Sequence, residues 1–395
     1  MTFSDKIDEW IQEAETRPGS ALMILKLVAN RLRDLTERNE ELLAENIALE
    51  NGTRVEEYQK RLTHLEFQLE MLKRRLGEDG AVLAGTPAGT ALSLLVYNAQ
   101  GRIFRLDPST RFRQAQPDSS GGEALGRITG ELSSDGELPR LLSVPADEEV
   151  LLLFTSGRIS TLSIAGLPAV EAGGEWAWEQ ASLPDEPHAG ELLACLMPLS
   201  RLPFSDLVVQ VSRRGNVKKT MTSLAQTVLS NRYLGRGAIQ KADQPFSAAL
   251  CQKKERFALV TYEGRLLGLE VDDLSYVAEE RIRLDTLDYV VAAFALAPSE
   301  SLLCLTQNGK VIVREGSSLE ISKSPQSRGQ ALISPSRLEQ GTRFIGAVAV
   351  READKLVVLD AEGRLTLHSA GDVTGAGSVR AGALILSVGV VPAAV

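Results

Sequence analysis

The sequence predicts an all-β six-bladed β-propeller that follows an α-helical coiled coil. Six times between Leu94 and His368, a short apolar strand runs into a turn that ends in glycine and then restarts. The turn glycines are 56, 58, 49, 45 and 54 residues apart, at Gly101, Gly157, Gly215, Gly264, Gly309 and Gly363. A strand-built unit that recurs every ~40–50 residues is typical of a propeller. Upstream of these units, leucines recur at heptad spacing, which indicates a coiled coil.

These patterns divide the chain into four segments. We predict a short N-terminal helix over residues 1–18 and a coiled-coil dimerisation stalk over 20–76. A stretch rich in Gly, Ala, Pro and Thr predicts a linker over 77–90, and the propeller follows over 91–395. The sequence does not decide between a closed ring and an open spiral of blades.

The stalk is predicted to form a homodimer. Asn39 and Asn46 fall at a positions of the first heptad run, where paired amides favour a two-stranded parallel coil. After Asn51-Gly52 the heptad phase shifts by two residues, so the stalk either continues as a coil or folds back into a helical hairpin. The predicted dimerisation residues are the heptad core positions Leu25, Val28, Leu32, Leu35, Asn39, Leu42, Asn46, Leu49, Leu62, Leu65, Leu69, Leu72 and Leu76.

A basic residue follows the turn glycine in five of the six units. The six positions are Arg102, Arg158, Asn216, Arg265, Lys310 and Arg364. Two interpretations are open, because Lys and Arg protect exposed strand edges from pairing and also bind phosphates. The second interpretation predicts a ring of cations along one edge of the disc.

Any nucleic-acid surface on this chain has to be local. The chain has 43 Lys and Arg against 52 Asp and Glu, a net charge of −9, whereas dedicated nucleic-acid binders are usually basic. The densest basic stretch, 213–256, has ten bases and two acids, a local charge of 10 − 2 = +8. The candidate DNA-binding residues are Arg102, Arg105, Arg158, Arg213, Arg214, Lys218, Lys219, Arg232, Arg236, Arg265, Lys310, Arg314 and Arg364.

The third unit carries the most specific pattern. A glycine turn leads into a lysine-rich strand, followed after a spacer by Arg-x-x-Gly-x-x-Ala-Ile, here Gly215, Val217, Lys218, Lys219, Thr220, Arg232, Gly235, Ala238 and Ile239. The fifth unit repeats the layout with Arg328, Gly329, Ala331 and Ile333. This pattern resembles the C-terminal β-propeller of the A subunits of DNA gyrase and topoisomerase IV. The resemblance covers about residues 91–395 and implies six blades with duplex DNA wrapped on a basic rim.

The chain also departs from that family. The Gln-Arg-Arg-Gly-Gly-Lys-Gly box of gyrase is absent, and residues 326–330, Gln-Ser-Arg-Gly-Gln, are at most a degenerate echo of it. No segment resembles the breakage–reunion domain, which carries the catalytic tyrosine. The resemblance is therefore to the propeller alone, here preceded by a predicted coil.

The sequence predicts no enzyme, no cofactor and no metal site. His64, His188 and His368 lack a Ser or Cys arrangement for nucleophilic catalysis, and the three cysteines form no metal-binding spacing. No apolar run reaches the ~18 residues of a membrane span, and the acidic N-terminus lacks the apolar segment of a secretory leader. We therefore expect a cytoplasmic protein that is nucleoid-associated if it binds DNA, and no membrane partner.

Two functions remain open on the sequence. The first is a non-enzymatic, dimeric DNA-binding or DNA-organising protein that holds duplex DNA on its basic edge without sequence specificity. The alternative is a protein–protein interaction scaffold that uses a propeller face and has lost the DNA rim. Trp176 and Trp178, in an acidic loop, either pack between blades or offer a partner protein an anchor.

Overall fold

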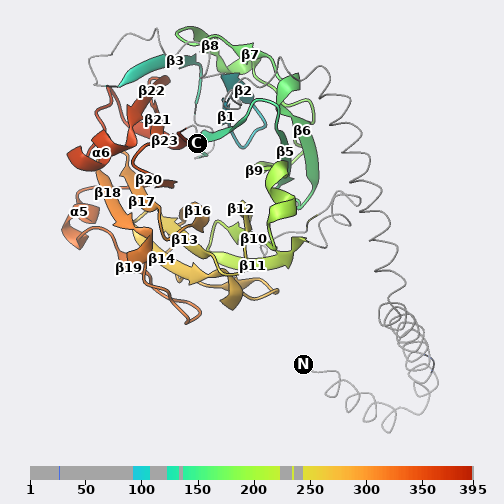
Figure 1. Cartoon of the computed structure of the whole chain (residues 1–395), viewed down its shortest axis with the longest axis vertical. Helices are drawn as coiled ribbons and strands as arrows, with labels where there is room; N and C mark the ends of the chain where they lie inside the picture. Colours follow the sequence, from blue (N-terminus) through green and yellow to red (C-terminus); the bar gives the residue numbers. More distant parts are fainter. Residues whose placement is uncertain are drawn as a thin grey trace, which may run out of the picture. The chain divides into compact units, whose positions relative to one another are not determined.

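The structure is a computed structural model that describes Lys26, residues 92–106, 122–132 and 137–222, Leu234, and residues 243–393. The predicted dimerisation residues of the stalk all lie outside the described residues, and so do Arg232 and Arg236. From Leu92 onward the strands form six blades arranged around one axis, as Figure 1 shows. The predicted six-bladed propeller is confirmed.

Each unit begins with an antiparallel hairpin at the position that the glycine pattern predicts. The hairpins are β1 (Leu92–Tyr97) with β2 (Ile103–Leu106), β5 (Glu149–Phe154) with β6 (Ile159–Ser163), β10 (Leu207–Ser212) with β11 (Asn216–Met221), β13 (Arg256–Thr261) with β14 (Arg265–Glu270), β17 (Ser301–Thr306) with β18 (Val311–Glu315), and β21 (Lys355–Asp360) with β22 (Arg364–Ser369). The six turn glycines have φ between +77° and +93°, a conformation that L side chains rarely adopt. The strands follow in the same order and direction in all six blades. The six hairpin turns therefore lie on one face of the disc, here called the turn face.

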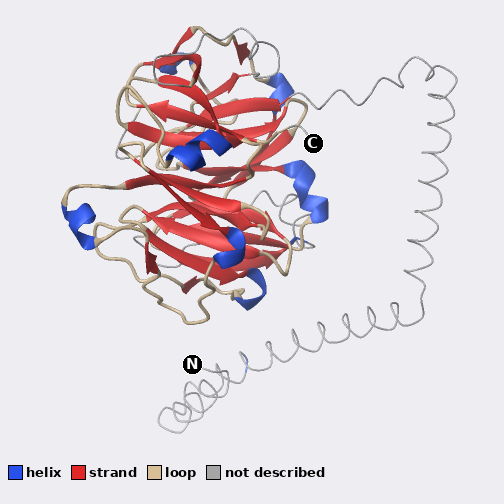
Figure 2. Ribbon diagram, turned by 60° about the vertical axis from the view of Figure 1, so that its left-hand side comes forward, coloured by secondary structure: helices blue, strands red, loops and turns tan. Residues whose placement is uncertain are grey.

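A third strand of each unit pairs with the first strand of its hairpin and lines the axis. These inner strands are β4 (Arg140–Pro145), β9 (Leu193–Pro198), β12 (Pro245–Cys251), β16 (Val290–Leu296), β20 (Phe344–Val350) and β23 (Ile385–Val391). The central hairpin strands are almost fully apolar and buried on both faces, because each blade packs between two neighbours. Figure 2 shows the stacked sheets edge-on.

The outermost segment of each blade comes from the next unit along the chain. We call these segments straps. In each blade the carbonyl of the turn glycine accepts a hydrogen bond of 2.7–3.1 Å from a strap amide, donated by Leu183, Leu234, Arg281, Leu332, Val379 and Ile128 in order around the ring. Three straps also contain short strands, namely β7 (Ala169–Val170), β15 (Glu279–Glu280) and β19 (Gln330–Ala331), which pair with β2, β11 and β14.

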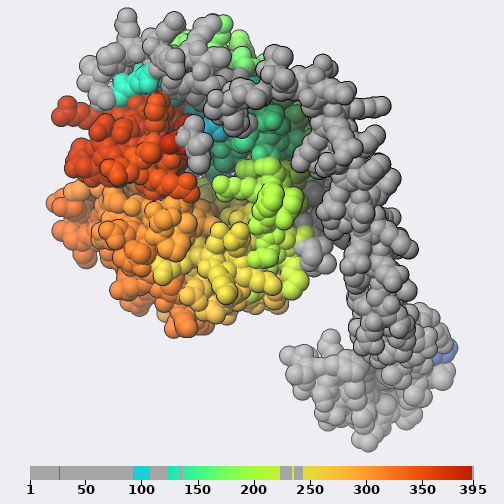
Figure 3. Space-filling view, in the orientation of Figure 1, coloured from blue at the N-terminus to red at the C-terminus, as the bar shows by residue number. Residues whose placement is uncertain are grey.

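The strap of the last blade closes the ring. It is β3 (Glu123–Thr129) of the first unit, which pairs with β22 of the sixth unit, and β8 (Glu175–Ala177) pairs with β3 on its outer side. Figure 3 shows this early segment against the late, red units at the rim. The propeller is thus a closed ring, a point that the sequence leaves open. Trp176 and Trp178 are both buried beside Phe104, so the tryptophans pack between blades.

Short helices complete the units. They are η3 (Ile164–Gly166), η4 (Trp178–Gln180), η5 (Leu199–Phe204), η7 (Val271–Asp273), η8 (Gly316–Ser318), α5 (Pro335–Glu339) and α6 (Ala370–Ala376). No helix in the described part of the chain is long and apolar enough to cross a membrane. The three cysteines are buried thiols, and burial raises the pKa of Cys195 to about 11 and that of Cys304 to about 12.

Candidate nucleic-acid interface

Three of the predicted DNA-binding residues hold short helices in place. Arg102 donates from Nη1 to the carbonyl of Glu179 at 2.8 Å, in η4, and Arg105 donates to the carbonyl of Ile164 at 3.0 Å, in η3. Lys219 is buried and donates from Nζ to the carbonyl of Asp272 at 2.6 Å, in η7. Carbonyls at the end of a helix lack intrahelical partners, so a cation there stabilises the helix. DNA could engage these side chains only by breaking those contacts.

Arg158 is held in an ionic cluster. Its guanidinium lies 2.7 Å from Glu191 and 2.8 Å from Asp185, and it stacks 3.8 Å above the ring of Phe154. Burial alone would raise the pKa of the Glu191 carboxyl, but hydrogen bonds from Arg158, from Ser156 and from the backbone of His188 outweigh it and lower that pKa to about 2. Glu191 is therefore ionised at neutral pH, and the cluster neutralises the Arg158 charge.

The dense basic stretch of the third unit is also largely engaged inside the fold. Arg213 forms a 2.6 Å ion pair with Glu137, and Arg214 donates to the carbonyls of Asp285 and Asp288. Lys218 is half-buried, its side chain bonds to no residue that the structure describes, and burial lowers its pKa. Arg232 and Arg236 lie outside the described residues. Because Arg213, Arg214 and Lys219 have partners inside the fold, the local charge of +8 overstates the number of cations that are available to a ligand.

Four of the predicted residues lie toward solvent at the outer edge. Lys310, Arg314 and Arg364 are exposed, and Arg265 is partly exposed. Arg364 pairs with Glu362 at 2.8 Å, and Arg314 donates to the neighbouring carbonyl of Val313. The side chains of Arg265 and Lys310 make no hydrogen bond or ion pair with any described residue. The prediction of DNA contact is thus most favourable at Arg265, Lys310 and Arg364, because Arg314 lies near the end of β18 that is farther from the turn.

The straps supply four further exposed bases, which are not among the predicted DNA-binding residues. They are Arg127, Arg283, Arg328 and Arg380. Each lies within four residues of the strap amide that bonds a turn glycine, and so next to that turn. Arg328 stood in the motif of the fifth unit, which was a usable signal. Arg127, Arg283 and Arg380 could not be found from the sequence in this way. Each flanks a turn of the preceding unit, so its distance along the chain from that turn is not fixed.

Backbone pairing places bases of the straps and of the hairpins near one another over four successive blades. Arg364 lies directly opposite Arg127 in the register of β22 and β3. Lys310 bridges to Ser378, two residues before Arg380, and the amide of Arg283 bonds the carbonyl of Ser327, the neighbour of Arg328, at 2.8 Å. We call this set the rim arc, and it comprises Arg127, Arg265, Arg283, Lys310, Arg328, Arg364 and Arg380 on blades three to six.

The rim arc does not continue over the described part of the first two blades. There Arg102 and Arg158 have internal partners, and the strap after Leu183 carries the acids Asp185 and Glu186. Negative side chains at this place repel phosphates. In the described rim the exposed bases therefore lie on blades three to six, where acids such as Glu279, Glu280 and Glu362 also lie.

Comparison with solved structures identifies the fold of the propeller. The structure of the DNA gyrase A C-terminal domain matches with a TM-score of 0.54 and 14% identity, covering 76% of this chain and 100% of that domain. The propeller has the fold of a gyrase A C-terminal domain. The C-terminal domain of DNA topoisomerase IV (TM-score 0.47, 16% identity, 77% of this chain and 94% of that one) and the E. coli ParC C-terminal domain (0.34, 11%, 77% and 100%) are more distant in shape.

The two sequence-based comparisons add nothing to this likeness. No protein-family model matches the chain, and no curated protein matches it. Within the described residues, no group of three or more His, Cys, Asp or Glu side chains is placed to hold a metal ion. What the gyrase-like propeller does in this chain therefore has to be argued from its own surface.

Proposed function

We propose that this chain is a non-enzymatic protein that binds duplex DNA along the rim arc, without reading its sequence. One observation carries the proposal: seven bases from straps and hairpins are brought to one outer edge over four successive blades. Binding of this kind needs only contacts between cations and phosphates, and no base edge has to be recognised. The fold likeness to the DNA gyrase A C-terminal domain supports a DNA-binding role but assigns no surface.

Several side chains of the rim arc have no partner among the described residues, which favours a role in binding another molecule. Arg283, Arg328, Lys310 and Arg380 are exposed, and their side chains have no bonded partner among the described residues. Bases that only protect strand edges would not need to gather on one sector, whereas a duplex running along the rim would meet them one after another. An exposed cation without a bonded partner can also meet a phosphate without breaking contacts inside the fold, which Arg102, Arg158 and Lys219 could not do.

The predicted coiled coil would make this weak binding effective. Two propellers joined by one stalk present two rim arcs to one duplex, so the second contact becomes intramolecular and the overall affinity rises. This part of the proposal rests on the heptads with Asn39 and Asn46. Sedimentation equilibrium of the full chain tests it, because a monomer at micromolar concentration would remove the avidity. Cytoplasmic, nucleoid-associated localisation is an expectation of the same proposal.

A charge-reversal experiment tests the rim directly. The test variant combines Arg283→Glu, Lys310→Glu, Arg328→Glu and Arg380→Glu. The matched control makes the same charge change on the opposite face of the disc, at exposed residues in the connections that precede the hairpins, Arg201, Lys253, Lys254 and Arg351. Fluorescence anisotropy with a labelled 30-base-pair duplex should show at least tenfold weaker binding for the test variant and a much smaller loss for the control. Equal losses would refute a localised rim.

A protein-interaction scaffold is the second candidate, favoured by a different observation. Four of the large apolar side chains that are exposed in the described structure lie on or beside the third blade, at Phe204, Met221, Tyr276 and Val277. The carbonyl of Ser205 bonds Thr222, and Nζ of Lys219 lies 5.0 Å from the ring of Tyr276, so these residues are neighbours. If the wild-type chain fails to bind DNA at low salt, this apolar surface becomes the better starting point.

A further inference from the structure

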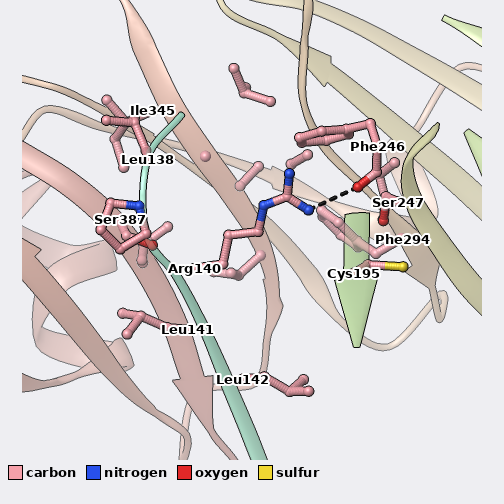
Figure 4. Close-up of a pocket in the computed structure, with 18 of the residues that line it drawn as sticks. Leu138, Arg140, Leu141, Leu142, Cys195, Phe246, Ser247, Phe294, Ile345 and Ser387 are labelled. Carbon is pink, nitrogen blue, oxygen red and sulfur yellow. Dashed lines mark hydrogen bonds between the residues drawn. The ribbon is translucent and has the colours of Figure 1, made fainter. Parts of the chain in front are cut away.

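A cavity of about 290 Å³ lies at the turn-face end of the axis. Residues of all six inner strands line it, and the side chain of Arg140 extends into its centre, as Figure 4 shows. Its walls mix polar side chains, among them Ser247, Tyr289 and Ser387, with apolar ones, which include Phe294, Phe344, Ile345 and Val388. A space of this size, with both polar and apolar walls, is at the lower end of the size range of small-molecule sites.

The described lining of the cavity carries one net positive charge. Among its lining residues the cations are Arg140 and Arg213, and the single acid is Glu137. Glu137 binds Nη2 of Arg213 at 2.6 Å but lies 3.8 Å from Nη2 of Arg140, which is longer than a hydrogen bond. One carboxylate is therefore shared unequally by two guanidinium groups, and an additional anion would balance the charge.

Both guanidinium groups are held rigidly before any ligand arrives. Arg140 lies 4.3 Å from the centre of the Phe246 ring, with Arg213 4.6 Å from the same ring and 4.7 Å from that of Tyr289. Arg140 also donates from Nη1 to the carbonyl of Phe246 at 2.8 Å. Stacking on aromatic faces fixes the planes of the guanidinium groups, so little conformational entropy remains to be lost on binding.

We propose that this axial cavity binds a small organic monoanion, a carboxylate with an apolar body. The carboxylate lies beside Arg140 and Arg213, next to Glu137, and the apolar body packs on Phe344 and Ile345. A carboxylate fits because Arg213 already holds one in a short ion pair. The single net positive charge of the described lining suits a monoanion better than a dianion, and Phe344 and Ile345 give a small inorganic ion nothing to pack against.

Ligand-observed saturation-transfer NMR on the full chain tests this assignment. The probe is 4-phenylbutyrate, with 4-phenylbutan-1-ol as its uncharged counterpart and inorganic phosphate as an anion without an apolar body. For a ligand of about twelve heavy atoms we expect a Kd of roughly 1 mM. Phenylbutyrate should bind with one site per chain, and the alcohol and phosphate should not. No phenylbutyrate binding at about 10 mM, or equal binding of the alcohol or of phosphate, would overturn the assignment.

Three variants locate the site. Ile345→Trp and Val388→Phe fill the cavity from two different blades and should each abolish binding, provided that thermal unfolding remains cooperative. Glu137→Gln removes the competing carboxylate and should tighten phenylbutyrate binding by about fivefold to tenfold. Unchanged affinity in a folded filling variant, or weaker binding in Glu137→Gln, would place the ligand elsewhere and contradict the proposal.

Discussion

Arg127 and Arg364 lie directly opposite each other on the paired strands β3 and β22, which join the first unit of the propeller to the last. Two like charges in this position destabilise a strand pair unless anions lie close by. Glu362 supplies the compensation, because its carboxylate lies 2.8 Å from Arg364 and its carbonyl accepts a 2.9 Å hydrogen bond from Arg127. The ring therefore closes at a point where two bases of the rim arc are held side by side.

Closure itself depends on Gly363. Its φ is +78°, and a Cβ atom at this position would lie 1.8 Å from the carbonyl oxygen of Ile128 in β3. We expect Gly363→Ala to lower the free energy of unfolding by about 3 kcal/mol, through backbone strain and loss of the strap hydrogen bond. Urea unfolding followed by fluorescence of the buried Trp176 and Trp178 measures it.

Gly375→Ala is the matched control. Gly375 lies inside α6, and nothing lies within 4 Å of a Cβ atom added there. Alanine also favours helix over glycine, so this variant should be neutral or slightly more stable. If both variants unfold at the same urea concentration, the strap contact at Gly363 does not hold the ring closed.

Two adjacent lysines on β11 should respond in opposite ways to the same substitution. Lys219 is buried and donates to the carbonyl of Asp272 in η7, so Lys219→Met should cost about 2 kcal/mol of stability. Burial lowers the pKa of Lys218, whose side chain bonds to no described residue, so Lys218→Met should be neutral or stabilising. Thermal denaturation of the two variants compares them, and a larger loss for Lys218→Met would refute this assignment of roles.

The Glu191 cluster predicts a defined pH dependence of stability. The pKa of Glu191 is about 2 in the folded chain, below its ordinary value of 4.5. Because the folded pKa is depressed, the ionised cluster stabilises the fold above pH 4.5, by up to about 3 kcal/mol, and this contribution is lost as the pH falls from 4.5 toward 2. Glu191→Gln should therefore be less stable than wild type at pH 7 and similar near pH 2. A constant difference between the two proteins would contradict the pKa shift.

The fold was predictable because its signal repeats. Six turn glycines, each with positive φ, mark six hairpins, and the apolar strands around them indicate blades buried on both faces. The straps were not predictable from local patterns. β15 and β19 are two residues long, too short to show alternation, and each pairs with a strand of the preceding unit.

The same reason limited the prediction of the site. Arg102 and Arg158 follow turn glycines as Lys310 does, and nothing local distinguishes the three. Their different roles depend on partners such as Glu179 and Glu191, which lie 77 and 33 residues away along the chain. A base after a glycine turn is therefore evidence for a position at the rim, and only the fold shows whether that base is available to a ligand.

The central claim is that cations of the rim arc bind DNA phosphates, and a salt titration of duplex binding tests it most directly. Each phosphate contact contributes about −0.9 to the slope of log K against log salt concentration. Five bases of the rim arc have no bonded partner among the described residues, namely Arg265, Arg283, Lys310, Arg328 and Arg380. Five contacts predict a slope of about −4.5 between about 50 and 200 mM salt. We expect steep salt dependence with equal affinity for unrelated duplex sequences. A slope shallower than about −1, or no binding at 50 mM salt, would contradict the account.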